Sequence, residues 1–258
     1  MNYDYIKIQE RYDGQITEIL LGPPPANIVC VKLMEEVLDC LKEQKGISSK
    51  KLIIFTGEGK HFSYGASVEE HLPETVNDMI PKFNQFIGEI LACEIPTLAK
   101  VSGLCLGGGF ELALACTFLF SDKTAKFAVP EIQLGVFPPV ASVLLPFKGG
   151  DVFSSQMILT GETFGADRLF ERGISNTVEE EGGLDASVGT FIEKMILPKS
   201  ASSLKIACRA ARLTLLDNYQ QHINRLEELY LGDLMSTQDA EIGLRSFVEK
   251  RPPTWLNS

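Results

Sequence analysis

One short segment, Lys51 to Thr56, most constrains the fold of this chain. It reads Lys-Leu-Ile-Ile-Phe-Thr, so its apolar residues are continuous and do not alternate with polar ones. Continuous runs of this length are typical of strands in parallel sheets, where helices cover both faces. An amphipathic helix is predicted before it from apolar residues spaced three and four apart: Val31, Met34, Val37, Leu38 and Leu41.

An apolar strand, Thr17 to Leu21, is predicted ahead of that helix and completes a β-α-β unit. It must stop at Gly22-Pro23-Pro24-Pro25, because proline fixes φ and has no N–H to donate. Asn27 is predicted to cap the helix that follows.

A second unit is predicted from Pro96 onward. Its elements are, in order, a strand at Thr97–Val101, a glycine turn at Leu106–Gly109, a helix at Phe110–Cys116, and strands at Phe118–Ser121 and Lys126–Ala128. Beyond Pro146 no strand is predicted, and helices are expected at Leu204–Leu215 and Tyr219–Leu231. The chain is therefore predicted to be α/β for about its first two-thirds and helical after that.

Composition restricts the partners. The chain has 258 residues and a formal net charge of -10, without the basic patch that nucleic-acid-binding proteins carry, so no nucleic acid is expected. The six cysteines show no Cys-x-x-Cys spacing and are expected to be reduced. No signal-like N-terminus and no apolar stretch of about 18 residues is present, so no membrane is expected and the cytoplasm is the expected location.

The run Gly107-Gly108-Gly109 lies between a predicted strand and a predicted helix. Glycines there occur in dinucleotide-binding loops, but Leu112 stands where the third glycine of that motif belongs, and Glu111 would repel a pyrophosphate. A tight turn would explain one or two glycines. Three in a row expose consecutive N–H groups at the positive end of a helix dipole, which favours an oxyanion site.

Two glutamates lie in apolar surroundings. Glu111 precedes Leu112-Ala113-Leu114-Ala115, and Glu131 follows Phe127-Ala128-Val129-Pro130. The simpler interpretations are a glutamate in the first turn of a helix and a solvated loop residue. Because a buried carboxylate is costly without a partner, we interpret the two as an acid/base pair whose environments separate their pKa values.

Other kinds of site lack the necessary residues. His61 and His71 have no metal-ligand spacing and His222 lies in a late helix, so no metal is predicted. No Gly-x-Ser-x-Gly elbow is present, and neither Ser63 nor Ser102 has an evident base, which disfavours a serine hydrolase.

Three segments together resemble the crotonase superfamily: His61 to Ser67, Gly103 to Ala113 and Phe127 to Gly135. The resemblance implies a spiral of repeated ββα units as an α/β core (residues 1–195). It also implies a helical C-terminal region (residues 196–258) that takes part in trimerisation and covers the site. Further implications are an acyl-CoA thioester as substrate, trimers often paired into hexamers, and no cofactor apart from the coenzyme A of the substrate.

Carried over by position, Glu111 and Glu131 occupy the two carboxylate positions of the hydratases in this family. The backbone N–H groups of Tyr64 and Gly108 are implied to form the oxyanion hole. The residues implied to border the substrate are Pro25, Ala26, Gly65, Ala66, Ser67, Gly107, Pro138, Pro139 and Val140. Many relatives keep only one of the glutamates, so the presence of both favours addition or removal of water.

The chain departs from the family pattern in three places. Tyr64 replaces a small residue, Ser67 replaces an aspartate, and Pro138 to Ser142 replaces a glycine-containing loop. Proline in place of glycine stiffens the loop, which predicts a narrow, rigid, apolar acyl pocket suited to a flat ring. These segments are similar to the branch of the family that hydrates cyclic dienoyl-CoA thioesters in anaerobic degradation of aromatic compounds.

The favoured function is therefore 1,4-addition of water to a cyclic dienoyl-CoA. The nearest alternative is a general 2-enoyl-CoA hydratase of fatty-acid β-oxidation, which shares every catalytic residue. RNA binding, known for some relatives, is disfavoured by the net charge of -10. A dinucleotide-dependent oxidoreductase is disfavoured by the failed glycine motif.

Overall fold

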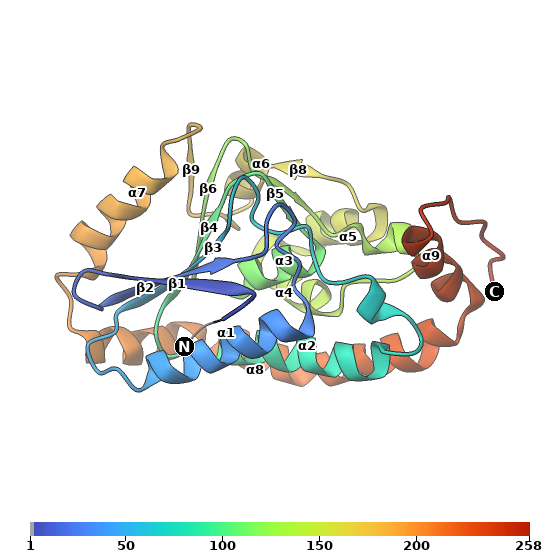
Figure 1. The fold of residues 1–258 in the computed structure, drawn as a ribbon, viewed down its shortest axis with the longest axis horizontal. Coiled ribbons are helices and arrows are strands. Elements are labelled where there is room, and N and C mark those ends of the chain that lie inside the picture. The colour runs from blue at the N-terminus through green and yellow to red at the C-terminus, as the bar shows by residue number, and fades with distance from the viewer. Residues whose placement is uncertain (1–2) are drawn as a thin grey trace.

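The computed structural model describes residues 3–258, so Met1 and Asn2 of the predicted 1–195 core lie outside it. Its main feature is a six-stranded sheet with the order β1-β2-β3-β4-β6-β9 (Figure 1). The strands are β1 (Ile6–Arg11), β2 (Ile16–Leu21), β3 (Leu52–Gly57), β4 (Thr97–Val101), β6 (Phe118–Asp122) and β9 (Thr177–Glu179). β1 pairs with β2 antiparallel, and all the other pairs in this sheet are parallel.

A smaller sheet has the order β5-β7-β8. Its strands are β5 (Leu104–Leu106), β7 (Lys126–Ala128) and β8 (Phe164–Gly165). β5 leads directly into a helix that begins at Gly107, and β7 ends just before Pro130. Because β5 and β7 are parallel neighbours, the glycine run and the second glutamate leave the same edge of this sheet. The pairing thus brings two segments that are distant in sequence to one place.

Helices cover both faces of the large sheet. The α-helices are α1 (Val31–Lys45), α2 (Val76–Leu91), α3 (Gly107–Ala115), α4 (Pro139–Gly149), α5 (Asp151–Thr160), α6 (Ala166–Glu171), α7 (Leu184–Phe191), α8 (Ala201–Glu228) and α9 (Gln238–Val248). The shorter 3-10 and π-helices are η1 (Glu69–His71), η2 (Pro130–Leu134), η3 (Ile192–Ile196), η4 (Leu229–Asp233) and η5 (Leu234–Ser236). Helix α2 packs against α1 and α8, and these three form the layer along the lower edge of Figure 1.

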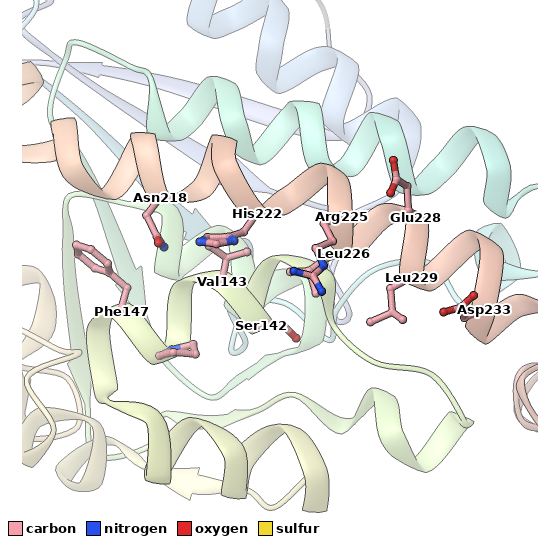
Figure 2. Close-up of a pocket in the computed structure, with 11 residues that line it drawn as sticks. Ser142, Val143, Phe147, Asn218, His222, Arg225, Leu226, Glu228, Leu229 and Asp233 are labelled. Carbon is pink, nitrogen blue, oxygen red and sulfur yellow. The ribbon is translucent and has the colours of Figure 1, made fainter.

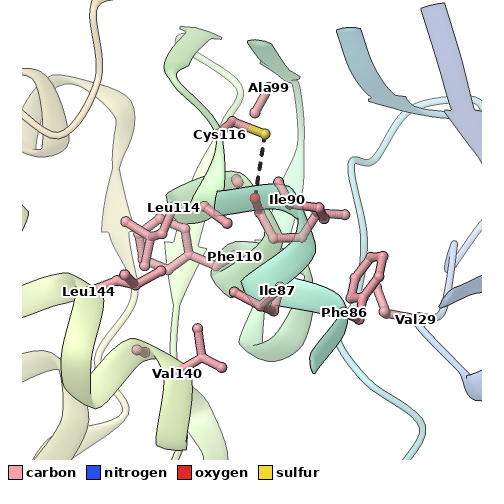
Figure 3. Packing of buried hydrophobic residues seen from close by; sticks show 14 of the residues in the cluster. Val29, Phe86, Ile87, Ile90, Ala99, Phe110, Leu114, Cys116, Val140 and Leu144 are labelled. Carbon is pink, nitrogen blue, oxygen red and sulfur yellow. Dashed lines mark hydrogen bonds between the residues drawn. The ribbon is translucent and has the colours of Figure 1, made fainter. Parts of the chain in front are cut away.

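The predicted burial of β3 on both faces is confirmed. Ile53 and Phe55 point into the main apolar core, whereas Leu52 and Ile54 point into a second cluster together with residues of α7. In the main core α2, α3 and α4 meet, and Figure 3 shows Ile87 and Ile90 of α2 on the side of α3 and α4, whereas Phe86 lies beside Val29. All nine residues of α3 are buried, so any polar side chain on it lies inside the protein.

The strands of the first two-thirds lie within a residue or two of their predicted positions, but two predictions for the second part are wrong. Two strands, β8 and β9, follow Pro146; they have two and three residues, too few to show a periodicity. The two predicted C-terminal helices are one helix, α8, of 28 residues. Strands β1 and β5 were also not predicted. The main core includes residues of α8 and α9, so the C-terminal region packs on the rest of the chain.

Asn27 does not cap α1, which is a further correction. The helix begins at Val31 with Cys30 at the N-cap, and Asn27 has a φ of 49°. Asparagine tolerates this left-handed conformation better than most residues. Its Nδ2 donates to the backbone carbonyls of three residues: Glu58 at 3.1 Å, His61 at 2.8 Å and Phe62 at 3.3 Å. Asn27 therefore ties the proline turn to the loop that leads to Tyr64.

Candidate active site

Glu111 is held between two helices. It projects from α3 and is 4% exposed, and the N–H of Ala141 donates to its Oε1 at 2.7 Å. Ala141 lies in the first turn of α4, where N–H groups have no acceptor within the helix and the dipole favours an anion. Burial raises the pKa of Glu111 to about 7, and the N–H groups of Ala141 and Val140 oppose that rise. Because α3 begins at Gly107, Glu111 lies beyond its first turn, contrary to prediction.

Glu131 is held differently, on the short 3-10 helix η2. Pro130 begins this helix, and Gly135 ends it in the left-handed conformation, with φ 71°. The Oε2 atom of Glu131 is buried and has no hydrogen-bond partner among residues 3–258. Burial raises the pKa of Glu131 well above its usual range, and the charge of Glu111 raises it further. Two carboxyl groups that interact in this way titrate together as a coupled pair.

Gly107 brings the glycine run into contact with Glu131. A Cβ atom at Gly107 would lie 2.7 Å from Glu131 Oε1, which is too close for a stable contact. Gly107 also has a φ of +46°, a conformation that side chains other than glycine rarely adopt. The glycine therefore allows the second carboxyl group to lie against the start of α3, near Glu111.

Gly108 brings α3 against the loop at residues 64–66. A Cβ atom at Gly108 would lie 2.9 Å from Ala66 Cβ and 3.1 Å from Ala66 N. As the second residue of α3, Gly108 has an N–H without an acceptor inside the helix. No acceptor is found for the N–H of Ala66 either, within the part of the chain that the structure describes. Two unpaired backbone donors thus lie close together, as an oxyanion site requires.

The predicted role of the Tyr64 N–H is wrong, because that group donates to the carbonyl of Ala26 at 2.8 Å. Ala66 takes its place as the neighbour of Gly108. Successive peptide groups in an extended segment point in opposite directions, so identifying the correct turn does not identify the correct N–H. The Tyr64 side chain is 39% exposed, and its ring lies edge-on to that of His61 at 5.2 Å.

These groups surround a cavity of about 80 Å³. Both glutamates, Gly108 and most of the predicted substrate-binding residues line it: Gly65, Ala66, Gly107, Pro138 and Pro139. Four predicted residues do not line it, namely Pro25, Ala26, Ser67 and Val140. The rest of the wall is mostly apolar and includes Met79, Ile80 and Phe83 from α2. His71, Phe137 and Leu244 are among the wall residues that were not predicted.

The prolines at the start of α4 explain part of this shape. Pro139 is the first residue of the helix, a position that suits proline because no N–H is needed there. The segment predicted to be a stiff loop is therefore the start of a helix. Val140 is fully buried in the core, and its N–H faces Glu111. The predicted narrow, apolar pocket agrees with a small cavity that Pro138 and Pro139 line.

Two larger pockets lack this combination. A groove of about 820 Å³ lies between α4 and α8, with His222 and Arg225 on one side and Val143 and Phe147 on the other (Figure 2). A pocket of about 690 Å³ on the sheet contains paired charges, such as Lys100 Nζ at 2.6 Å from Glu18 Oε1. Buried carboxyl groups with raised pKa values are typical of catalytic sites, so we assign the site to the smaller cavity.

The family model described as enoyl-CoA hydratase/isomerase matches residues 11–258. The chain belongs to the enoyl-CoA hydratase/isomerase family. The cyclohexa-1,5-dienecarbonyl-CoA hydratase of Thauera aromatica is 35% identical over 252 residues, which are 98% of this chain and 97% of that protein. The carnitinyl-CoA dehydratase of Escherichia coli K12 is 30% identical over 251 residues, 94% of this chain and 95% of that protein.

Solved structures of the enoyl-CoA hydratase/isomerase family share the fold. The family member from Pseudoalteromonas atlantica T6c has a TM-score of 0.86 at 21% identity, covering 98% of this chain and 100% of that one. The member from Xanthobacter autotrophicus Py2 has a TM-score of 0.85 at 25% identity, covering 97% and 98%. The resemblance to the crotonase superfamily and the predicted fold class are confirmed. The predicted enzyme class, a hydro-lyase, is confirmed too, because the relatives are named hydratases and dehydratases.

Within residues 3–258, no group of three or more His, Cys, Asp and Glu side chains has the arrangement of a metal site. No described helix has the length and apolar character needed to cross a membrane.

Proposed function

We propose that this enzyme adds water to a conjugated dienoyl-CoA thioester. One observation carries the proposal: two buried carboxyl groups and two unpaired backbone N–H groups surround the same apolar cavity. Carboxyl groups can move protons, and paired N–H groups can hold a negatively charged oxygen. Addition of water to an unsaturated thioester needs both, and it involves no net oxidation or reduction. No cofactor is therefore required beyond the coenzyme A that forms part of the substrate.

The N–H groups of Ala66 and Gly108 would bind the thioester carbonyl oxygen. When water attacks the β carbon, the electrons of the double bond move toward this oxygen and form an enolate. The two donors stabilise that charge more strongly than they stabilise the neutral carbonyl. Removing one such donor typically lowers the rate about 100- to 1,000-fold.

Glu111 and Glu131 would divide the proton transfers between them. The N–H of Ala141 stabilises the ionised form of Glu111, whereas Glu131 Oε2 is buried without a donor. The pair therefore holds one proton near neutral pH, and that proton stays on Glu131. Glu111 takes a proton from the attacking water, and Glu131 gives its proton to carbon. The proton taken from water then moves from Glu111 to Glu131, which restores the starting protonation state of the pair.

For the acyl group, we propose cyclohexa-1,5-diene-1-carbonyl-CoA, an intermediate of anaerobic benzoyl-CoA degradation. The hydroxyl adds to C2, the dienolate is protonated at C5, and the remaining double bond joins C1 and C6. Renumbered, the product is 6-hydroxycyclohex-1-ene-1-carbonyl-CoA. The small apolar cavity with two prolines in its wall and the 35% identity to the Thauera aromatica enzyme support this choice.

A panel of CoA thioesters tests the proposal. The purified enzyme is incubated with the cyclic diene, crotonyl-CoA and carnitinyl-CoA, and the products are identified by mass and NMR. We expect kcat/KM for the cyclic diene to exceed that for crotonyl-CoA by about 100-fold, the discrimination that pocket shape can supply. A preference for crotonyl-CoA would support a general 2-enoyl-CoA hydratase instead. If no thioester gains or loses water, the proposed function is wrong.

A further inference from the structure

Tyr230 carries a buried hydroxyl group that the proposed reaction does not yet use. The residue is 1% exposed, and its Oη has no hydrogen-bond partner among residues 3–258. Buried tyrosine hydroxyls usually have a partner, because an unpaired one loses the bonds that it makes with water when the chain is unfolded. A buried hydroxyl that remains unpaired therefore needs an explanation.

Tyr230 lies directly behind the wall of the cavity. Its ring packs edge-on against Phe137, with 5.3 Å between centroids, and lies 6.5 Å from the ring of His71. Both of these residues line the cavity. Tyr230 belongs to the π-helix η4, which continues α8. A short π-helical segment changes the direction of the side chains that follow it and is frequent at functional sites.

Both glutamates affect the pKa of Tyr230. Burial is the main cause that raises the pKa of its phenol, and the charges of Glu131 and then Glu111 raise it further. The hydroxyl therefore keeps its proton and can act as a donor. Burial lowers the pKa of His71, and its Nδ1 lies 2.7 Å from the carbonyl of Ser67, so this ring is neutral with Nδ1 as the donor. The titratable groups that line the cavity with Glu131 are Glu111 from α3, His71 from η1 and Tyr64, and Tyr230 from η4 lies behind its wall.

Glu131 Oε2 is the complementary atom, because it is a buried acceptor without a donor. We propose that Tyr230 is a positioning residue for Glu131, and that its hydroxyl supplies the hydrogen bond that Glu131 Oε2 lacks. One bridging water is enough to connect two buried groups of this kind. The catalytic role of this hydrogen bond rests on the proposed hydration, but the hydrogen bond itself does not.

The proposed hydrogen bond shifts the pKa of Glu131 in a definite direction. A donor stabilises the ionised carboxylate, so the Tyr230 hydroxyl lowers the pKa of Glu131 and opposes the effect of burial. Replacing Tyr230 by phenylalanine removes the donor and raises the pKa of Glu131, by about one unit for a single hydrogen bond to a charged group. The limb of the pH–rate profile that Glu131 controls moves to higher pH, whether that limb reports an acid or a base.

Tyr219 offers a matched control. It is 2% exposed, lies on α8, and its hydroxyl donates to the carbonyl of Asn84 at 2.8 Å. Tyr219→Phe removes a hydrogen bond that is already made, so it should lower the melting temperature and leave the pH–rate profile unchanged. Tyr230→Phe should lower kcat about 10-fold and shift the profile, whatever its effect on the melting temperature.

The experiment measures kcat against pH, the melting temperature, and the carboxyl ¹³C titration of Glu131, assigned by its loss in Glu131→Gln. 3-Fluorotyrosine at position 230 keeps the ring and makes the phenol a stronger donor, so the pKa of Glu131 should move down. Unchanged titration in both Tyr230 variants, or an equal shift in Tyr219→Phe, overturns the proposal. Because the ¹³C titration needs no substrate, it decides the link even if the enzyme hydrates no CoA thioester. Failure of the hydration itself appears separately, in the wild-type product analysis.

Discussion

Glu111 and Glu131 face one cavity but are held by different kinds of structure. Glu111 stands on α3, a helix of which every residue is buried, and receives an N–H from the start of α4. Glu131 stands on the five-residue helix η2, and its Oε2 has no partner among the described residues. Burial raises the pKa of both side chains, but it raises that of Glu131 further, because the backbone around the two differs. In the proposed mechanism the base thus stands in the buried core and the acid on a short 3-10 helix.

The two supports also come from different parts of the chain. Residues of α2 and α4 surround α3, whereas η2 packs against α5 and against α9 near the C-terminus. The contact between η2 and α9 is very close, since a Cβ atom at Gly243 would lie 2.0 Å from the carbonyl oxygen of Leu134. The position of Glu131 therefore depends on the C-terminal region in a way that the position of Glu111 does not.

The largest expected effect comes from removing either carboxylate. Glu111→Gln and Glu131→Gln should each lower kcat about 100- to 10,000-fold, because each loses one proton transfer. In the wild type, kcat should fall as the pH drops below about 7, where Glu111 becomes protonated, and Glu111→Gln should lose this dependence. The kcat of the double variant should be only slightly lower than that of the less active single variant, because the pair acts as a unit. Fully multiplicative losses in steady-state assays would argue for independent roles.

Gly107→Ala should disturb Glu131 while leaving Glu111 in place. The added Cβ would lie 2.7 Å from Glu131 Oε1, and φ at this position is +46°. Displacing a reacting group by about 1 Å can cost about 100-fold in rate, so we expect a loss of that size in kcat. Gly189→Ala in α7, where a Cβ would meet nothing within 4 Å, serves as the control and should behave as wild type. Comparable losses in both variants would point to general destabilisation.

Gly243→Ala should act on Glu131 from a distance. To relieve the clash with Leu134, α9 and η2 must separate, which should cost about 1–3 kcal/mol of unfolding free energy. We expect kcat to fall about 10-fold, less than for Gly107→Ala, because the displacement reaches the carboxyl group indirectly. Chemical unfolding and initial rates measure the two effects. The prediction fails if stability falls while kcat and its pH dependence stay the same.

The smallest expected effect is a change in how the free energy of unfolding depends on pH. The folded-state pKa of Glu131 is raised, so folding favours the protonated form, and this contribution is lost as the pH rises from about 4.5 through the folded-state pKa. Glu131→Gln lacks the ionisable group and should be more stable than the wild type at pH 8, by about 1–3 kcal/mol. Near pH 4 the two should be equal. Urea unfolding at several pH values gives the difference, and a pH-independent difference would contradict a buried carboxyl group.

Much of the first two-thirds of the fold could be predicted from the sequence because its strands and helices repeat at clear periods. The continuous apolar run of β3 indicates that both of its faces are buried, and the three/four spacing in α1 indicates that one face of the helix is buried. Strands β8 and β9 carry no such signal, since two or three residues acquire their conformation only by pairing with β7 and β6. Asn27 was misassigned for a similar reason: its amide bonds to carbonyls 31 to 35 residues away.

By itself, the sequence determined the candidate residues of the site: Glu111, Glu131 and the glycines that begin α3, because carboxyl groups in apolar surroundings and runs of glycine are visible without coordinates. Only the tertiary structure decided which amide joins Gly108, since the direction of an N–H depends on where its neighbours bond; Tyr64 bonds to Ala26, and Ala66 is left free. It also decided which carboxyl group receives a donor. That choice follows from the contact between α3 and the start of α4, and no local pattern encodes such a contact.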